Sequence, residues 1–187
     1  MTINWAAQAV AAVGFISFII SFQIKSNKAL LVLQMFSDLM FCVQFILLGA
    51  ISGCLSLFSM VLRNVVILFK EKHKWARWYG WVIVFTLLLL ACTIYSWAGI
   101  KSLLPFVASA VSTFAYWRDN ARAYRTSNLF CSCPCWLIYN VIVGSYVGIL
   151  NETITMLSII ISIIRFGWKA LDGNSFERES KKRVSQS

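Results

Sequence analysis

Seven long apolar stretches fill most of this 187-residue sequence and restrict what the chain can fold into. A helix that crosses a bilayer needs about 20 mostly apolar residues. The stretches are apolar on every side instead of alternating, which favours helices over the strands of a barrel. We therefore expect an all-α polytopic membrane protein, with spans at 5–22, 29–48, 54–69, 79–97, 102–117, 129–150 and 153–168.

The composition excludes several other classes of protein. Hydrophobic residues make up 59% of the chain and charged residues only 13%, about half the usual share in a soluble domain. This argues against a soluble enzyme, a disordered chain and a disulfide-stapled secreted domain. The sequence also lacks the G-x-S-x-G, H-E-x-x-H and phosphate-loop motifs, and it has one histidine. We expect neither enzymatic activity nor a cofactor.

The positions of the basic residues account for the net charge of +10. They cluster between the apolar runs, which is typical of a membrane protein and not of a nucleic-acid-binding one. The outer connections hold only Lys101, so the positive-inside rule predicts an outer N-terminus and a cytoplasmic C-terminus. The basic residues on the inner side are Lys25, Lys28, Lys70, Lys72, Lys74, Arg77, Arg118, Arg122, Arg125, Lys169, Arg178, Lys181, Lys182 and Arg183.

Two matched glycine pairs suggest an internal repeat. Gly49 and Gly53 are expected to end the second span, and Gly144 and Gly148 the sixth, at an offset of 95 residues. This predicts two parallel triple-helix repeats, at 1–70 and 101–170, joined by a linker helix within 71–100 and followed by a disordered basic tail at 171–187. The alternative is that glycine commonly ends membrane helices.

The three-one-three arrangement resembles the SWEET and PQ-loop superfamily. The run from Phe22 to Asp38 is similar to its loop pattern, although Phe22-Gln23 replaces the Pro-Gln pair. The chain resembles the YgjV-type family of bacterial inner-membrane proteins more closely, in length, in the run from Gln44 to Ala50 and in Leu62-Arg63-Asn64. The superfamily resemblance implies transport of sugars or amino acids. It also implies helix-kinking prolines in both repeats, whereas the candidate hinges Pro105 and Pro134 both lie in the second.

Two charged residues lie inside predicted spans, where charge is costly. Asp38 and Arg63 lie at similar depths, about 13 Å and about 10 Å from the inner face at 1.5 Å per residue. An ion pair between them is expected. The pair either belongs to a polar solute path with Gln34, Asn64 and Asn140, or is a salt bridge that holds the second and third spans together.

The run Cys131-Ser-Cys133-Pro-Cys135 is the sharpest local motif. Three thiolates can hold a soft metal such as Cu(I), but on an undistorted helix Cys133 points away from Cys131 and Cys135. Cysteine is also an ordinary small core residue, and we favour that interpretation.

The sequence therefore predicts an inner-membrane carrier or facilitator of a small polar solute that works by alternating access. The alternative is a membrane interaction or assembly protein without transport, and a minor one is thiol-based metal handling. The expected partners are the bilayer and the solute. Each triplet is small, which leaves a homodimer open.

Overall fold

Helices account for nearly all of the chain in the computed structural model, which describes residues 4–21, 27–70, 73–118 and 121–170. No strand occurs in these ranges, which confirms the all-α prediction. Two short 3₁₀ turns, Lys74–Arg77 and Ile100–Ser102, flank α4, and a π-helical segment, Asn128–Ser132, joins α6 to α7. The α-helices are α1 (Trp5–Ser21), α2 (Asn27–Leu47), α3 (Ile51–Phe69), α4 (Gly80–Tyr95), α5 (Leu103–Trp117), α6 (Ala121–Ser127), α7 (Cys133–Val143) and α8 (Tyr146–Ala170).

The sequence placed the turn between the last two spans about seven residues too late. Helix α7 ends at Gly144, whose φ of 73° requires a residue without a Cβ, and α8 begins at Tyr146. Gly148 therefore lies inside α8 and does not end the preceding helix, and Gly53 lies inside α3 in the same way. The physical reason is that one left-handed glycine is enough to reverse the chain. The polar run at 151–153 belongs to a helix and not to a loop.

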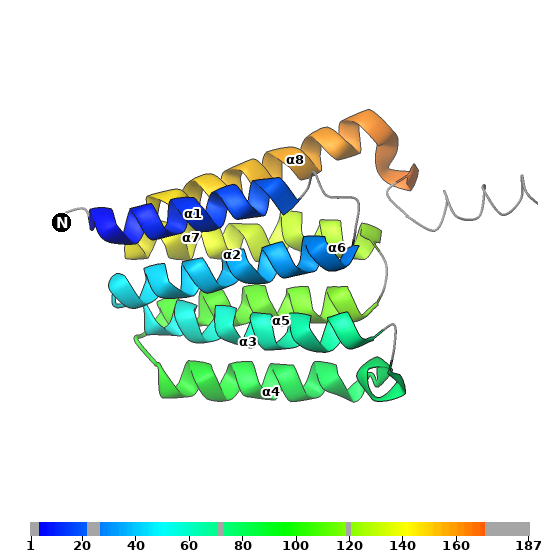
Figure 1. Ribbon diagram of the computed structural model, residues 1–187, viewed down its shortest axis with the longest axis horizontal. Coiled ribbons are helices and arrows are strands. Elements are labelled where there is room, and N and C mark those ends of the chain that lie inside the picture. The colour runs from blue at the N-terminus through cyan, green and yellow to red at the C-terminus, as the bar shows by residue number, and fades with distance from the viewer. Residues whose placement is uncertain (1–3, 22–26, 71–72, 119–120, 171–187) are drawn as a thin grey trace, which may run out of the picture.

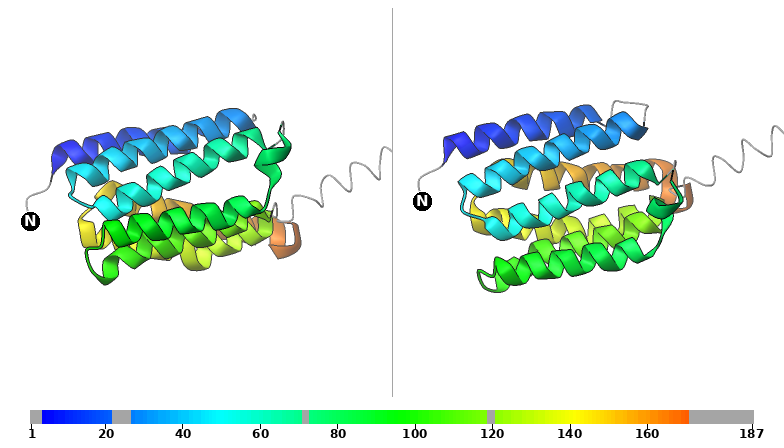
Figure 2. Two further views of the ribbon diagram at one scale, coloured as in Figure 1. Left: turned by 90° about the horizontal axis from the view of Figure 1, so that it is seen from below. Right: turned by 60° about the horizontal axis from the view of Figure 1, so that its bottom comes forward.

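The helices form a closed ring (Figures 1 and 2). Helix α1 packs along α2, α2 along α3, α3 against α5, α5 against α7, α7 against α8, and α8 back against α1. Helix α4 lies outside the ring and packs on α3 and α5. Aromatic rings fill the centre between α2 and α7: Phe45 stacks on Trp136 at 6.0 Å and meets Tyr139 edge-on at 5.6 Å.

The surface is apolar and much of the interior is polar, which is the reverse of a soluble protein. Exposed large apolar side chains occur on every long helix. Two stretches, 51–69 and 125–143, are long and apolar enough to cross a bilayer, and shorter apolar helical stretches lie in α1, α2, α4 and α8. The buried polar side chains include Ser37, Gln44, Ser52, Ser56, Ser59, Arg63, Asn64, Ser109, Ser112, Thr113, Asn140 and Ser145.

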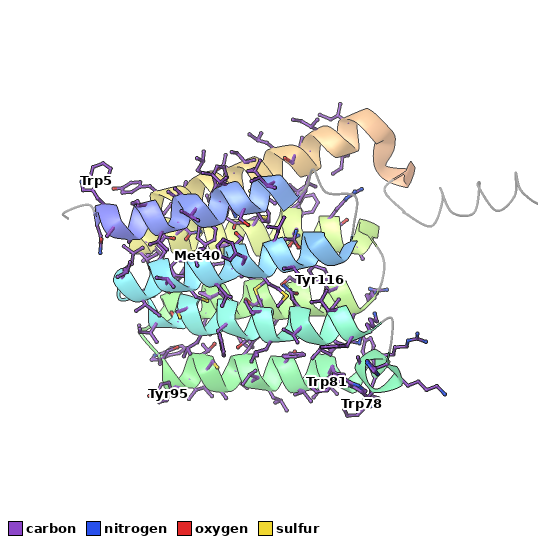
Figure 3. The ribbon with its side chains drawn as sticks, in the orientation of Figure 1. Trp5, Met40, Trp78, Trp81, Tyr95 and Tyr116 are labelled. Atoms are coloured by element: carbon purple, nitrogen blue, oxygen red, sulfur yellow. The ribbon has the colours of Figure 1, made fainter. Side chains whose placement is uncertain are left out.

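The two ends of the bundle differ in charge. The α2–α3, α4–α5 and α7–α8 turns lie at the end where α1 begins, and the ends of α3 and α5 and the starts of α4 and α6 lie at the opposite end (Figure 1). Exposed aromatic side chains mark both ends: Trp5 and Tyr95 on one, and Trp78, beside the half-buried Trp81, on the other (Figure 3). The predicted first basic connection at 22–26 and the predicted tail at 171–187 lie outside the described residues.

Candidate functional site

The side chain of Arg63 forms the centre of a polar group inside the ring. It comes from the second half of α3 and is 1% exposed. Its Nε and Nη2 donate to Oδ1 of Asn64 at 3.3 and 3.0 Å. Its Nη1 donates to Oγ1 of Thr113 at 3.1 Å and to Oγ of Ser112 at 3.4 Å. The guanidinium also lies 4.6 Å from the ring centre of Tyr116, so one cation ties α3 to α5.

The predicted partners Asp38 and Arg63 are joined through Asn64. The Nδ2 of Asn64 donates to Oδ2 of Asp38 at 3.5 Å, while its carbonyl oxygen accepts from Arg63. The hydroxyls of Ser112 and Thr113 accept from Arg63 and donate to the backbone carbonyl of Ser109. The hydrogen bonds thus run from α2 through α3 into α5, where a buried charge requires such partners.

A second acidic residue of the interior was missed from the sequence. Glu152 is half-buried in the second turn of α8, where its Oε1 accepts from Nδ2 of Asn151 at 3.2 Å. Cys133 of α7 and Asp38 of α2 both lie close enough to interact with it electrostatically. The glycine repeat could have revealed this residue. At the same offset of 95 residues, Glu152 matches Leu57, which is buried, so an interior position was to be expected for Glu152 as well.

Two other candidate path residues lie apart from Arg63. Gln34 is half-buried on α2, one turn before Asp38. Asn140 is 3% exposed, and its side chain packs where α7 meets α8: a Cβ added to Gly148 would lie 2.5 Å from Oδ1 of Asn140. Asn140 therefore belongs with Glu152.

The candidate hinges lie in different settings. Pro105 is the third residue of α5, where a proline breaks no intrahelical bond and leaves the helix straight. Pro134 is the second residue of α7, directly after the π-helical segment. Proline removes a helix hydrogen bond at this point, and π-helical turns often mark functional positions.

The three clustered cysteines do not come together as a metal site. Cys131 and Cys135 lie near each other, one turn apart, while Cys133 lies near Glu152. Across the described ranges no three His, Cys, Asp or Glu side chains gather as metal ligands would. All six cysteines are free thiols.

Side chains from one part of the ring satisfy helix ends in another. Helix α3 begins after Ala50, which has no polar side chain to cap it, and the hydroxyl of Tyr139 instead accepts from the backbone N–H of Gly53 at 2.9 Å. Ser52 also shares a hydrogen bond of 2.9 Å with that hydroxyl. Sequence patterns cannot reveal this contact, because the two residues are 86 positions apart.

A comparable contact holds the first turn of α8. Gln8 of α1 accepts from the backbone N–H of Val147 at 3.2 Å and donates to the carbonyl of Gly144 at 2.9 Å. Gln44 of α2 donates to Gln8 and accepts from the hydroxyl of Ser145 at 3.0 Å. Helices α1 and α2 thus supply hydrogen bonds that the start of α8 lacks.

Comparison with known proteins agrees with the apolar surface and buried polar interior. The chain is 26% identical over 169 residues to the inner membrane protein YgjV of Escherichia coli (strain K12), covering 90% of this chain and 88% of that protein. No solved structure matches the chain. The family profile Imp-YgjV, described as a bacterial inner membrane protein, matches residues 5–170. The chain therefore belongs to the Imp-YgjV family of bacterial inner membrane proteins.

Proposed function

We propose that this protein carries a small polar solute across the bacterial inner membrane. In this proposal the chain crosses the membrane seven times, with the N-terminus outside and the C-terminus inside. Helices α1–α3 form one triplet, and α5, the α6–α7 stretch and α8 form the other, with α4 as linker. The two triplets move against each other to expose the solute to either side.

The turn geometry supports the two-triplet arrangement. The backbone N–H of Ala50 bonds to the carbonyl of Phe45 at 2.7 Å, and Ser145 bonds to Asn140 at 2.9 Å. Each atom of the first bond has its counterpart 95 residues later. Gly49 and Gly144, at the same offset, have φ angles of 69° and 73°. The two turns thus share the same backbone geometry as well as the same glycine spacing.

One observation carries the proposal of transport. Polar and charged side chains from both triplets meet halfway along the helices, where lipid-facing proteins avoid charge. The connected atoms run from Asp38 through Asn64 and Arg63 to Thr113. Together with the bundle's apolar surface, this polar interior between the two proposed triplets supports a path for a polar solute.

The two contacts between the triplets suggest which one opens. At the α3–α5 contact, Arg63 bonds to two hydroxyls and α4 packs across both helices. In the second triplet, the residue that matches Arg63 is Ser158 of α8, which is uncharged and exposed, so no such buried cation joins α8 to α1 at this position. We place the fixed axis at α3–α5 and the moving contact at α8–α1.

Metabolite profiling tests the proposal. Cells that lack the gene are compared with cells that overexpress it, and with cells that express Asp38→Asn, Arg63→Gln or the double variant at equal membrane levels. A solute should accumulate or deplete with the wild-type protein and change at least tenfold less with the single variants. Lys101→Gln, a change at an exposed residue, serves as the matched control. If the folded double variant transports at the wild-type rate, the polar group is not the solute path.

A second candidate function has one observation in its favour. The donors of Arg63 already bond to protein groups of α3 and α5, as they would in a purely structural lock. In that case the chain is a membrane assembly protein. Profiling would then give no solute that follows expression, and the protein would co-purify with a membrane partner.

A further inference from the structure

Hydrogen-bond donors and acceptors are unevenly distributed around the ring interior. On the α3–α5 side, the guanidinium donors of Arg63 bond to neighbouring side chains. On the α7–α8 side, acceptors are in excess. Two buried amide oxygens, Oδ1 of Asn140 and Oδ1 of Asn151, have no hydrogen-bond partner. Buried acceptors without donors are rare in proteins and call for an explanation.

These unpartnered oxygens lie beside a carboxylate. Gly148, Asn151 and Glu152 are three and four residues apart and so share one face of α8. Asn151 donates to Glu152 through its Nδ2, which leaves its carbonyl oxygen next to the carboxylate. Asn140 of α7 packs against Gly148, one turn earlier on that face. The acceptors therefore belong to one locality between two helices.

Acidic side chains outnumber basic ones in this locality. Asp38 lies close enough to Glu152 to interact with it electrostatically, so two carboxyl groups accompany the single guanidinium of Arg63. The buried indole of Trp136 lies on α7 one turn before Asn140. Carboxylates, carbonyl oxygens and an aromatic ring are the groups that recognise organic ammonium ions.

We propose that α2, α7 and α8 form a binding site for the ammonium group of a small solute. Glu152 and Asp38 supply negative charge, and Asn140 and Asn151 accept its N–H donors. An anionic solute would bring neither the donors nor the charge that this side lacks. The inference rests on the proposed carrier function and names the class of its solute. Gly148 packs on Asn140, so the site is closed in this conformation. In the proposed carrier it becomes accessible when the two triplets separate at the α8–α1 contact.

Binding to the purified full-length protein in detergent tests the site. The probe is methylammonium chloride, and unfolding is followed by the fluorescence of the eight tryptophans. At about ten times the dissociation constant, a single site should raise the midpoint by about 3–6 °C. Equal concentrations of sodium chloride and potassium chloride are the ionic controls, and radiolabelled methylammonium gives the stoichiometry directly.

Two variants locate the binding. Glu152→Gln should abolish the shift and weaken binding of the label at least tenfold. Asn140→Leu should also abolish it while raising the midpoint of the ligand-free protein, since it removes an unpartnered oxygen from the core. This opposite effect separates lost binding from lost folding, and it keeps the test available if Glu152→Gln does not fold.

Three results would overturn the ammonium site. They are an equal shift with sodium chloride, a shift that survives both variants, and the absence of any shift or bound label. Metabolite profiling tests the carrier function separately. If the protein transports a solute without an amine and does not bind methylammonium, the carrier function is supported and the ammonium site is rejected.

Discussion

Arg63 illustrates how a single buried charge is made tolerable in a membrane bundle. Its guanidinium has donors facing Asn64, Ser112 and Thr113, and its plane faces the ring of Tyr116. A cation in this setting is stabilised only while its partners stay in place, since the alternative is an uncompensated charge in a medium of low polarity. When the cation is removed, these buried polar partners are left with unsatisfied hydrogen-bonding groups, which destabilises the fold.

Removal of the guanidinium should therefore be costly. Arg63→Gln is expected to lower the free energy of unfolding by about 3–5 kcal/mol, because it leaves Asp38 and the α5 hydroxyls with fewer partners. Lys101→Gln, at an exposed position, should change it by less than about 0.5 kcal/mol. Denaturation in mixed micelles measures both. Equal stability of the two variants would show that Arg63 does not hold α3 to α5.

The hydroxyl of Tyr139 has a similarly local role. It accepts from the N–H of Gly53, which lies in the first turn of α3 and has no helical partner. Tyr139→Phe should cost about 1–3 kcal/mol, because the buried N–H loses its acceptor. Tyr95→Phe removes a hydroxyl from a side chain that is 86% exposed and is the control. Backbone hydrogen exchange at Gly53 should increase only in Tyr139→Phe.

At the scale of the element, the short turns determine where the helices lie. Gly49 and Gly144 end α2 and α7 with positive φ angles and have open space where a Cβ would be. Gly53 and Gly148 follow inside the next helices, in contact with Tyr139 and Asn140. The first glycine of each pair allows the positive φ angle of the turn, and the second allows the close approach of a neighbouring side chain.

This division predicts two magnitudes of effect. Gly49→Ala and Gly144→Ala should each cost about 1 kcal/mol, since only the backbone is strained. Gly53→Ala should cost about 1–3 kcal/mol, because its Cβ would lie 2.6 Å from the ring of Tyr139. Thermal unfolding of the three variants under one condition makes the comparison. A larger loss at Gly49 than at Gly53 would contradict the assignment.

The extent to which elements could be predicted differs along the chain. Long apolar runs predicted α1 to α5 within a few residues. The start of α8 was misplaced because Asn151, Glu152 and Thr153 are polar, and a polar run normally indicates a loop. The half-buried side chains of Asn151 and Glu152 face the polar interior, which exists only once the ring has closed, whereas Thr153 is exposed. Contacts such as Tyr139 to Gly53 depend on that closure and leave no local pattern.

For the whole molecule, the distribution of charge predicts the orientation in the membrane. Lys101 lies at the end where α1 begins, and Arg77 lies at the opposite end. In a variant without the native cysteines, Lys101→Cys should react with a membrane-impermeant maleimide in intact spheroplasts. Arg77→Cys should react only after the membrane is opened. Labelling of Arg77→Cys in intact spheroplasts would reverse the proposed orientation.

The capping of α3 by Tyr139 also has a consequence for biosynthesis. Gly53 leaves the ribosome 86 residues before the hydroxyl that completes its hydrogen bonding. Until α7 has been made, that N–H lacks the acceptor that the folded protein gives it. The start of α3 can therefore reach its native hydrogen bonding only late in synthesis, and its completion depends on a part of the chain far away in sequence.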